Sequence, residues 1–400
     1  MTGEVLDAHH APASVENDAT RTPSSVRIAF PFVGDLIGGS HLSTLGLIKN
    51  LDRTRYEPIV FVQNKRGAIA ALFEREGVAC EEVTDVPDLV HGRHLRPSDL
   101  FHLISSLWPT CRALRSRKIS IVHTNDGRTH AAWSLAAKLA GASLVWHHRS
   151  KADALGLRYV APLLADQVIS VSEYSLSKSS FFRGRSGTVI HSPFDTHARY
   201  DARAVRQSLC TEIGCPPKAR LVAFSGALIG RKRPFMFIEA IAQARRMRPH
   251  LEIHGLIFGE EIDYTAAQLT AHAVQKEVAQ AVHLLGYRTP GPRWLAGCDA
   301  LLVPAIDEPF GRTLIEAMLV GVPVIATRSG GNAEALRGGS LGMLVSPDRP
   351  LEMAAALVEL FDQPSLSTEI RKRARVDACA RFGEQRHAEQ VMGLYDKLLG

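Results

Sequence analysis

The sequence has no continuous run of about 18 uncharged apolar residues, the length that a transmembrane helix needs. Its most apolar stretch, from Ala131 to Trp146, is interrupted by Lys138. Aromatic residues make up only 6% of the chain, and they do not alternate with basic residues along a stripe. The sequence therefore predicts no membrane-spanning segment and no nucleic-acid partner.

Paired cysteines and a secretion signal are also missing. The six cysteines are scattered, and none forms a Cys-x-x-Cys pair. The first 25 residues are polar and lack the basic start and apolar centre of a signal peptide. We therefore expect reduced thiols, a cytoplasmic protein and a flexible tail over residues 1–25.

What is present is an average globular composition in a chain of 400 residues, which suits two or three domains. Apolar residues account for 46% and charged residues for 22%. The formal net charge is +6, which favours anionic partners such as phosphates or acidic lipids without choosing between them.

Short apolar runs alternate with helical patterns in two halves of the chain. Continuously apolar strands of this kind are typical of parallel sheets covered on both faces. We predict two doubly wound α/β domains, over residues 26–195 and 196–380, with a last helix over 381–400. The predicted strands are 26–33, 58–62, 119–123, 143–147, 167–171 and 188–191, then 221–225, 251–258, 282–285, 300–303, 323–326 and 343–345. The predicted helices include 42–51, 68–76, 100–114, 130–139, 160–165, 234–246, 351–361 and 384–399.

Two loops after strands carry glycines or cations. Gly38 and Gly39 follow the first strand, where a glycine loop lets a backbone approach a ligand or simply turns the chain.

Three consecutive cations, Arg231, Lys232 and Arg233, follow the first strand of the second half. Cations before a helix oppose its dipole, and a bound polyanion would reverse that penalty. A solvated basic turn is the alternative.

The most informative segment runs from Pro304 to Glu334. It places Glu308 in a loop after a strand and Glu316 inside the following helix, with seven residues between them. Free amides at the start of that helix lie between the two carboxylates. Carboxylates that bind hydroxyls, beside amides that bind an anion, suit a sugar joined to a diphosphate.

This segment resembles the Glu-x7-Glu signature of retaining glycosyltransferases with the GT-B architecture, most like glycosyltransferase family 4. The resemblance extends from Val26 to the end of the chain. It includes Gly38-Gly39, the strand 165–172, the stretch 189–195 and Leu285-Gly286-Tyr287. It implies two facing Rossmann-like domains with a cleft between them, and a last helix that crosses back onto the N-terminal domain.

The resemblance also implies roles for individual residues. Glu316 would hold the ribose, Glu308 would face the donor sugar, and Lys232 with Arg231 or Arg233 would neutralise the diphosphate. A histidine at the end of the fifth strand would approach the sugar, and register favours His148 over His147. The implied catalytic residues are His148, Glu308 and Lys232. The implied donor-binding residues are Gly38, Gly39, Arg231, Lys232, Arg233, Tyr287, Phe310, Gly311, Arg312, Thr313, Leu314 and Glu316.

The sequence also departs from the family. Gly226-Ala227-Leu228 stands where the family often has Gly-Arg-Leu, and Ser192-Pro193 where it has Asn-Gly. The family's Pro-Glu after the double glycine is Ala333-Glu334 here. Neither glutamate nor Lys232 is lost, so the resemblance still implies an active enzyme.

The resulting prediction is a retaining transferase that moves a hexose-type sugar from a UDP or GDP sugar to a glycan, lipid-linked or small-molecule acceptor. The sequence has no Asp-x-Asp and no histidines at zinc-type spacing, so we expect neither metal nor cofactor. The alternatives are a nucleotide-sugar 2-epimerase and a non-catalytic binder of nucleotide sugars.

An apolar and basic stretch in the N-terminal half suggests a further partner. It runs from His94 through Leu100, Phe101, Leu103, Ile104, Leu107 and Trp108 to Arg112, Arg115, Arg117 and Lys118. Such a stretch fits peripheral contact with an anionic membrane on its inner face. A buried helix with a basic exposed end is the alternative.

Overall fold

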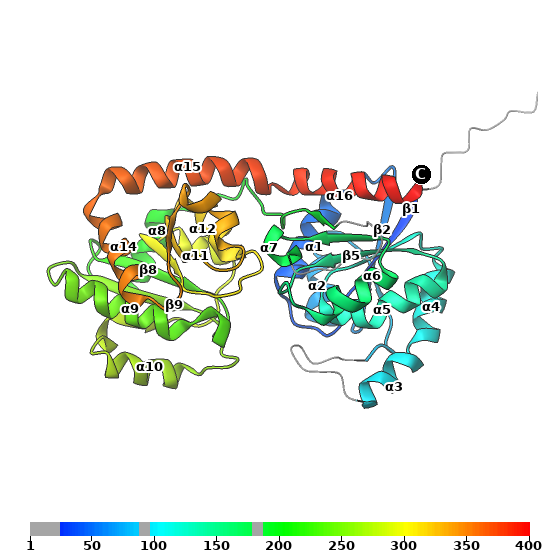
Figure 1. Ribbon diagram of the computed structural model, residues 1–400, viewed down its shortest axis with the longest axis horizontal. Coiled ribbons are helices and arrows are strands. Elements are labelled where there is room, and N and C mark those ends of the chain that lie inside the picture. The colour runs from blue at the N-terminus through cyan, green and yellow to red at the C-terminus, as the bar shows by residue number, and fades with distance from the viewer. Residues whose placement is uncertain (1–24, 88–96, 178–186) are drawn as a thin grey trace, which may run out of the picture.

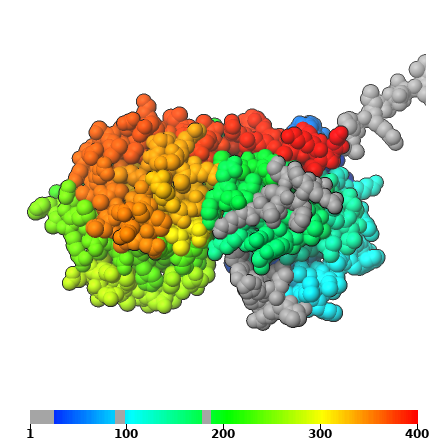
Figure 2. All heavy atoms as spheres, in the orientation of Figure 1, coloured from blue at the N-terminus to red at the C-terminus, as the bar shows by residue number. Residues whose placement is uncertain are grey.

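The computed structural model describes residues 25–87, 97–177 and 187–400. The chain forms two lobes, and its last two helices run along both of them (Figures 1 and 2). Residues 1–24 of the predicted tail (1–25), and the start of the predicted membrane stretch, 94–96, lie outside the described residues.

The N-terminal domain is built on a parallel sheet in the order β3-β2-β1-β4-β5-β6-β7. Ile28 of β1 lies opposite Pro58 of β2 on one side and Ile121 of β4 on the other. The strands are β1 (Val26–Pro31), β2 (Tyr56–Val62), β3 (Cys80–Glu82), β4 (Ile121–Thr124), β5 (Ser143–His148), β6 (Gln167–Ser170) and β7 (Thr188–Val189). The helices are α1 (Gly39–Lys49), α2 (Ala68–Glu74), α3 (Pro97–Ser105), α4 (Leu107–Ser116), α5 (Gly127–Ala140), the π-helical turn η1 (Gly156–Val160), α6 (Ala161–Leu164) and α7 (Glu173–Leu176).

The C-terminal domain has a second parallel sheet in the order β10-β9-β8-β11-β12-β13. Its strands are β8 (Arg220–Ser225), β9 (Ile253–Phe258), β10 (Val282–Leu284), β11 (Ala300–Val303), β12 (Val324–Thr327) and β13 (Met343–Val345). Its α-helices are α8 (Ala202–Ile213), α9 (Pro234–Met247), α10 (Ala266–Gln275), α11 (Gly291–Leu295), α12 (Arg312–Leu319), α13 (Asn332–Ala335), α14 (Pro350–Asp362) and α15 (Pro364–Phe382). Short 3₁₀ turns are η3 (Gly230–Lys232), η4 (Ala279–Ala281) and η5 (Arg337–Gly339).

Each sheet is covered on both faces, which explains its continuously apolar strands. In β1, Ile28 and Phe30 belong to the core on one face, whereas Ala29 belongs to the core on the other. In β8, Leu221 and Ala223 alternate in the same way with Val222 and Phe224. The predicted doubly wound α/β fold with two domains is confirmed.

The chain crosses between the domains twice, at adjacent places. The first crossing follows β7, and the second lies at Gly383, between α15 and α16 (Glu384–Leu399). The two are joined where the Phe194 N–H donates to the Phe382 carbonyl at 2.8 Å. Helix α16 then packs against the N-terminal domain, where Val391 and Tyr395 enter its core.

The predicted single helix over 100–114 is wrong, because the structure has two helices that meet at Ser106. Pro109 supplies the reason. Proline is tolerated in the first turn of a helix, where its missing N–H has no partner anyway, but it disrupts a helix interior. Starting a new helix at Leu107 places Pro109 in a first turn.

Candidate active site between the two domains

Two loops of the C-terminal domain meet at the edge of its sheet that is formed by the C-terminal ends of the strands, here called its carboxyl edge. One follows β8 and the other follows β11. These two strands are neighbours in the sheet, although β9 and β10 come between them in the chain. From β8 the connections proceed outward to β9 and β10, then return to β11 on the other side. Doubly wound sheets bind ligands at this reversal point. The Ile306 N–H donates to the Arg231 carbonyl at 3.0 Å and holds the two loops together.

Glu308 is the central carboxylate of this edge, and only 6% of its surface is exposed. Its Oε2 atom lies 2.6 Å from Arg231 Nη1 and 2.6 Å from Lys232 Nζ. Burial raises the pKa of Glu308, but the charges of Lys232 and Arg231 outweigh burial and hold the pKa below its ordinary value. Glu308 is therefore ionised at neutral pH and fixes both cations.

Glu316 lies on α12 and is paired more loosely. Its Oε1 atom is 3.8 Å from Arg312 Nη2, one turn earlier on the same helix. Burial raises the pKa of Glu316 above its ordinary value, opposed in part by the charges of Arg312 and Lys232. A side chain on Gly291 would lie 3.2 Å from Glu316 Oε2, so glycine there keeps space beside the carboxylate.

Arg312 connects the site to the N-terminal domain. Its Nη1 atom donates to Ser43 Oγ at 2.8 Å and to the Pro193 carbonyl at 3.3 Å. Its guanidinium also stacks over the Phe194 ring at 4.3 Å. A Cβ atom on Gly39 would lie 2.6 Å from Arg312 Cδ, so only glycine allows this close approach.

A cavity of about 250 Å³ lies between the domains. Four cations line it, and Glu308 is the carboxylate among its lining residues. From the N-terminal side the lining consists of Gly39, Ser43, Arg149, Val171 and Ser192; from the C-terminal side it consists of Arg231, Lys232, Glu308, Pro309, Phe310, Gly311, Arg312 and Thr313.

The cavity thus brings together eight of the residues that the sequence singled out: Gly39, Arg231, Lys232, Glu308, Phe310, Gly311, Arg312 and Thr313. Others lie outside its lining. Arg233 forms an ion pair with Asp348, Tyr287 is largely exposed, and Leu314 is buried in the core. Gly38 precedes α1 and donates its N–H to His41, while Glu316 forms an ion pair with Arg312.

Neither His147 nor His148 lines the cavity, in contrast to the expectation that one of them faces it. Both rings make contacts within the N-terminal domain. His148 Nε2 lies 2.9 Å from the Lys151 carbonyl, and His147 Nδ1 lies 3.0 Å from His123 Nε2. Burial lowers the pKa of both histidines.

Arg149, the residue after them, reaches the cavity instead. Its Nη1 atom donates to Ser192 Oγ at 3.0 Å, and its Nη2 atom lies 3.2 Å from His147 Nδ1. The sequence reasoning missed Arg149. The signal that could have found it is a cation directly beyond the carboxyl end of a parallel strand, the edge where such sheets bind ligands.

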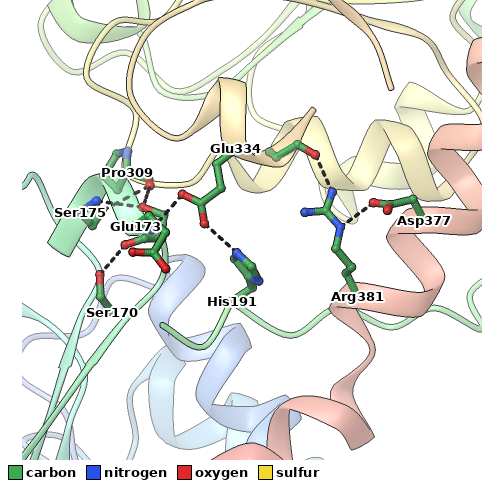
Figure 3. A network of polar contacts seen from close by, with 10 residues as sticks. Ser170, Glu173, Ser175, His191, Pro309, Glu334, Asp377 and Arg381 are labelled. Carbon is green, nitrogen blue, oxygen red and sulfur yellow. Dashed lines mark hydrogen bonds and ion pairs between the residues drawn. The ribbon is translucent and has the colours of Figure 1, made fainter. Parts of the chain in front are cut away.

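Polar contacts join the domains behind the Pro309–Phe310 segment (Figure 3). Glu334 accepts from the Glu173 N–H at 2.9 Å and lies 2.8 Å from His191 Nε2. Ser175 Oγ donates to the Pro309 carbonyl at 3.3 Å, and the His191 ring stacks on Phe310 at 5.0 Å. These contacts fix the loop that carries Glu308 against the N-terminal domain.

Two features are absent from the described residues, a metal-binding cluster and a membrane-spanning helix. No group of three or more histidine, cysteine, aspartate or glutamate side chains is placed to hold a metal ion. None of the helices in the described ranges combines the length and hydrophobicity that a bilayer crossing requires.

Sequence comparison matches residues 219–363 to the family described as glycosyl transferases group 1. This range covers most of the C-terminal domain, from the residue before β8 to the residue after α14. A D-inositol 3-phosphate glycosyltransferase of Corynebacterium jeikeium is 30% identical over 47% of this chain and 46% of its own length. The chain thus matches a little under half the length of that relative. A protein of the same name from Thermobispora bispora is 24% identical over 92% of each chain.

Solved structures match over more of the chain. Anabaena Alr3699/HepE in complex with UDP and glucose has a TM-score of 0.78 at 22% identity, covering 93% of this chain and 100% of that one. Sucrose-phosphate synthase from Thermosynechococcus elongatus has a TM-score of 0.73 at 19% identity, covering 93% and 99%. At these identities the likeness shows the fold, which is the predicted GT-B architecture. The family match supports a glycosyltransferase-type C-terminal domain over residues 219–363.

Proposed function

We propose that this chain is a retaining, metal-independent glycosyltransferase of family 4 that moves a hexose-type sugar from a nucleotide-diphosphate sugar to an acceptor hydroxyl. The observation that carries the proposal is the cavity lining, which holds Arg149, Arg231, Lys232 and Arg312 against the single carboxylate of Glu308. Such an excess of positive charge in a partly desolvated cavity suits a diphosphate.

The donor would lie along the C-terminal edge. Arg231 and Lys232 contact the diphosphate, the Gly311–Thr313 segment supplies amides at the start of α12, and Glu316 accepts hydrogen bonds from the ribose hydroxyls. Glu308 orients the two cations and faces the transferred sugar. We expect the donor to be a UDP sugar, because the structural neighbour from Anabaena was solved with UDP and glucose.

The transfer step follows from these positions. The bond between the anomeric carbon and the diphosphate oxygen breaks, and the acceptor oxygen bonds to the same face of that carbon. The acceptor proton passes to the departing phosphate oxygen. Arg231 and Lys232 stabilise the charge that develops on the phosphate, a contribution that a divalent cation makes in other enzymes. EDTA is therefore expected to leave activity unchanged, and a strong loss would contradict metal independence.

The acceptor would bind on the N-terminal side of the cavity. The curated relatives are named for transfer to D-inositol 3-phosphate, which supports a small polyol among glycan, lipid-linked and small-molecule acceptors. Because the relatives from Corynebacterium jeikeium and Thermobispora bispora are named glycosyltransferases, the 2-epimerase and the non-catalytic binder are not favoured.

Glu316→Gln tests the placement of the nucleotide. The change removes a charge-assisted hydrogen bond to the ribose, so the affinity for UDP is expected to fall about tenfold to a hundredfold. Isothermal titration calorimetry measures this directly. Glu369→Gln, an exposed position on α15, is the control. An unchanged affinity in Glu316→Gln would place the nucleotide elsewhere.

Peripheral membrane contact is a second part of the proposal. Helices α3 and α4 expose Leu100, Phe101, Ile104 and Trp108, of which Phe101 is 71% and Trp108 74% exposed. The exposed Arg112, Arg115, Arg117 and Lys118 follow on α4 and just after it. Apolar side chains beside cations suit an anionic lipid surface on the cytoplasmic side.

Co-sedimentation with vesicles tests the membrane contact. The wild type is expected to bind phosphatidylglycerol vesicles and not phosphatidylcholine vesicles, and the double change Phe101→Ser with Trp108→Ser is expected to abolish binding. Leu351→Ser, at an exposed apolar position of the C-terminal domain, is the control. Equal binding by the double variant would contradict this assignment.

A further inference from the structure

The loop that carries Glu308 is supported at close range by its own domain. A Cβ atom on Gly330 would lie 2.4 Å from the Glu308 carbonyl oxygen, and one on Gly331 would lie 2.6 Å from the Pro309 carbonyl oxygen. The Gly331 N–H also donates to the Glu308 carbonyl at 2.7 Å. Only the double glycine allows this approach, so the C-terminal domain holds one side of the loop.

Asp307, the residue before Glu308, has an unusual backbone conformation. Its φ angle is +49°, in the left-handed region that residues with a Cβ atom adopt rarely. Such a conformation persists only where the surrounding contacts hold it. One of these contacts lies within the C-terminal domain, where the Asp307 N–H donates to Ser329 Oγ at 3.1 Å. The other comes from the opposite domain.

Helix α7 of the N-terminal domain contacts the loop on both sides of Glu308. The Tyr174 hydroxyl donates to Asp307 Oδ1 at 2.9 Å, and the Ser175 hydroxyl donates to the Pro309 carbonyl at 3.3 Å. Burial, followed by the hydrogen bond to Asp307, raises the pKa of Tyr174 to about 12, so the hydroxyl keeps its proton at neutral pH. One short helix thus binds the residues before and after Glu308 across the domain boundary.

Glu334 adds a contact from the C-terminal domain. Its carboxylate accepts from the Glu173 N–H at 2.9 Å and lies 2.8 Å from His191 Nε2 (Figure 3). Glu173 is the first residue of α7, and His191 follows β7. Together with Tyr174 and Ser175, α7 therefore donates to the C-terminal domain from three successive residues.

Glu308 in turn fixes two cations of the donor side. A single oxygen atom, Oε2, lies 2.6 Å from Arg231 Nη1 and 2.6 Å from Lys232 Nζ. Because both contacts depend on one atom, a displacement of the loop would disturb both cations together. Neither Tyr174 nor Glu334 lines the cavity, so any effect they have on a donor acts through Glu308.

We propose that Tyr174 and Glu334 are positioning residues for the transfer step. Across the domain boundary they hold the loop 307–309, and with it Glu308, in the orientation that the two donor cations require. This inference rests on the proposed function and deepens it, because the donor side is then complete only while α7 contacts the C-terminal domain.

Hydrogen exchange measured by mass spectrometry tests the positioning without any substrate. Tyr174→Phe removes one hydroxyl and keeps the ring, so exchange in a peptide spanning residues 306–313 is expected to rise at least about threefold. Glu334→Ala is expected to have the same effect. Tyr159→Phe, the same change at an exposed tyrosine of the N-terminal domain, should leave exchange unchanged. Unchanged exchange in Tyr174→Phe or Glu334→Ala would overturn the role of that residue.

Kinetics then tests the effect on the reaction, with the release of UDP from UDP-glucose as the assay. Tyr174→Phe is expected to lower kcat about fivefold to tenfold, while calorimetry finds the wild-type affinity for UDP and the wild-type number of sites per chain. A parallel loss of UDP affinity would assign Tyr174 to the nucleotide and overturn the proposal. Failure of the wild type to bind UDP would contradict the proposed function, whereas the exchange result would still decide the positioning.

A double-variant cycle distinguishes positioning through Asp307 from a general structural role. Asp307→Gly removes the acceptor of the same hydrogen bond and suits the left-handed conformation, so adding Tyr174→Phe should not lower kcat further. Glu334→Gln keeps an acceptor for the Glu173 N–H, so it should retain more activity than Glu334→Ala. Losses that multiply in the double variant, or equal losses in the two Glu334 variants, would overturn the role of the residue concerned.

Discussion

The two domains share a strand order but differ at the edges that face each other. At the C-terminal edge, carboxylates accompany the cations: Glu308 contacts Arg231 and Lys232, and Glu316 lies beside Arg312. At the N-terminal edge, Arg128, Arg149 and His41 retain buried nitrogen atoms without partners. The two edges therefore differ in charge pairing: carboxylates contact Arg231, Lys232 and Arg312 at the first edge, whereas Arg149 at the second edge forms no ion pair with the described residues.

The interior of the N-terminal domain also differs from that of the C-terminal domain, because it contains a group of buried neutral histidines in contact with one another. His123 lies between Tyr395 of α16, at 2.5 Å, and His147 of β5, at 3.0 Å, and His147 in turn contacts Arg149. The His387 ring of α16 stacks on His147 at 5.9 Å. These contacts link the returning C-terminal helix to the cation in the cavity.

The largest expected difference between the edges concerns catalysis. Lys232→Ala removes a cation that stabilises the departing phosphate, so kcat should fall about 10²–10³-fold. Arg149→Gln weakens acceptor binding, so the KM for the acceptor should rise about tenfold while kcat changes less. Steady-state kinetics with a UDP sugar separates the two effects.

Lys218→Ala, at an exposed position of the C-terminal domain, is the control for this comparison and should behave as the wild type. If Lys232→Ala changed only the KM for the acceptor, the assignment of the diphosphate to the C-terminal edge would be wrong. If Arg149→Gln lowered kcat as much as Lys232→Ala does, Arg149 would act on the donor.

The next difference concerns pH and stability. Burial, followed by the charge of Arg149, lowers the pKa of His123 and His147 well below 6.5, and that of His387 falls to about 3. Below pH 6.5 the unfolded chain binds protons at these positions and the folded chain does not. The free energy of unfolding should therefore decrease as pH falls from 6.5, by up to about 1.4 kcal/mol per pH unit for each histidine.

Urea unfolding at several pH values, followed by tryptophan fluorescence, measures this slope. Trp133 and Trp146 are buried in the N-terminal domain and report on it. His147→Gln should reduce the slope by the contribution of one proton, whereas His250→Gln, at an exposed position, should not. A slope unaffected by His147→Gln would mean that His147 is protonated in the folded chain.

The sequence was sufficient to predict the parts of the molecule that depend on local pattern. The alternation of apolar runs predicted both sheets, and the spacing of Glu308 and Glu316 predicted one loop and one helix start. Pro109 could also have predicted the separation of α3 and α4, since proline favours the first turn of a helix. These features are determined by residues close together in the chain.

The direction of side chains at the domain interface could not be predicted in the same way. The three consecutive cations Arg231, Lys232 and Arg233 look equivalent in sequence, but only two reach the cavity, because Arg233 pairs with Asp348. Similarly, His148 ends β5 and Arg149 follows it directly, and their different surroundings come from Lys151 and from Ser192. Such choices depend on contacts between distant segments.

The smallest expected effect is on stability at neutral pH, where the two edges should respond in opposite directions. Arg149→Met removes a cation that lacks a carboxylate partner, so the free energy of unfolding should rise by about 1 kcal/mol. Arg231→Met deprives buried Glu308 of one of its two cations, so the free energy of unfolding should fall by about 1–2 kcal/mol. Chemical denaturation in the absence of ligand measures both changes. A loss of stability in Arg149→Met would mean that the contacts of Arg149 with Ser192 and His147 stabilise the fold by more than the burial of its charge destabilises it. The two edges would then not differ in how well their cations are stabilised without a ligand.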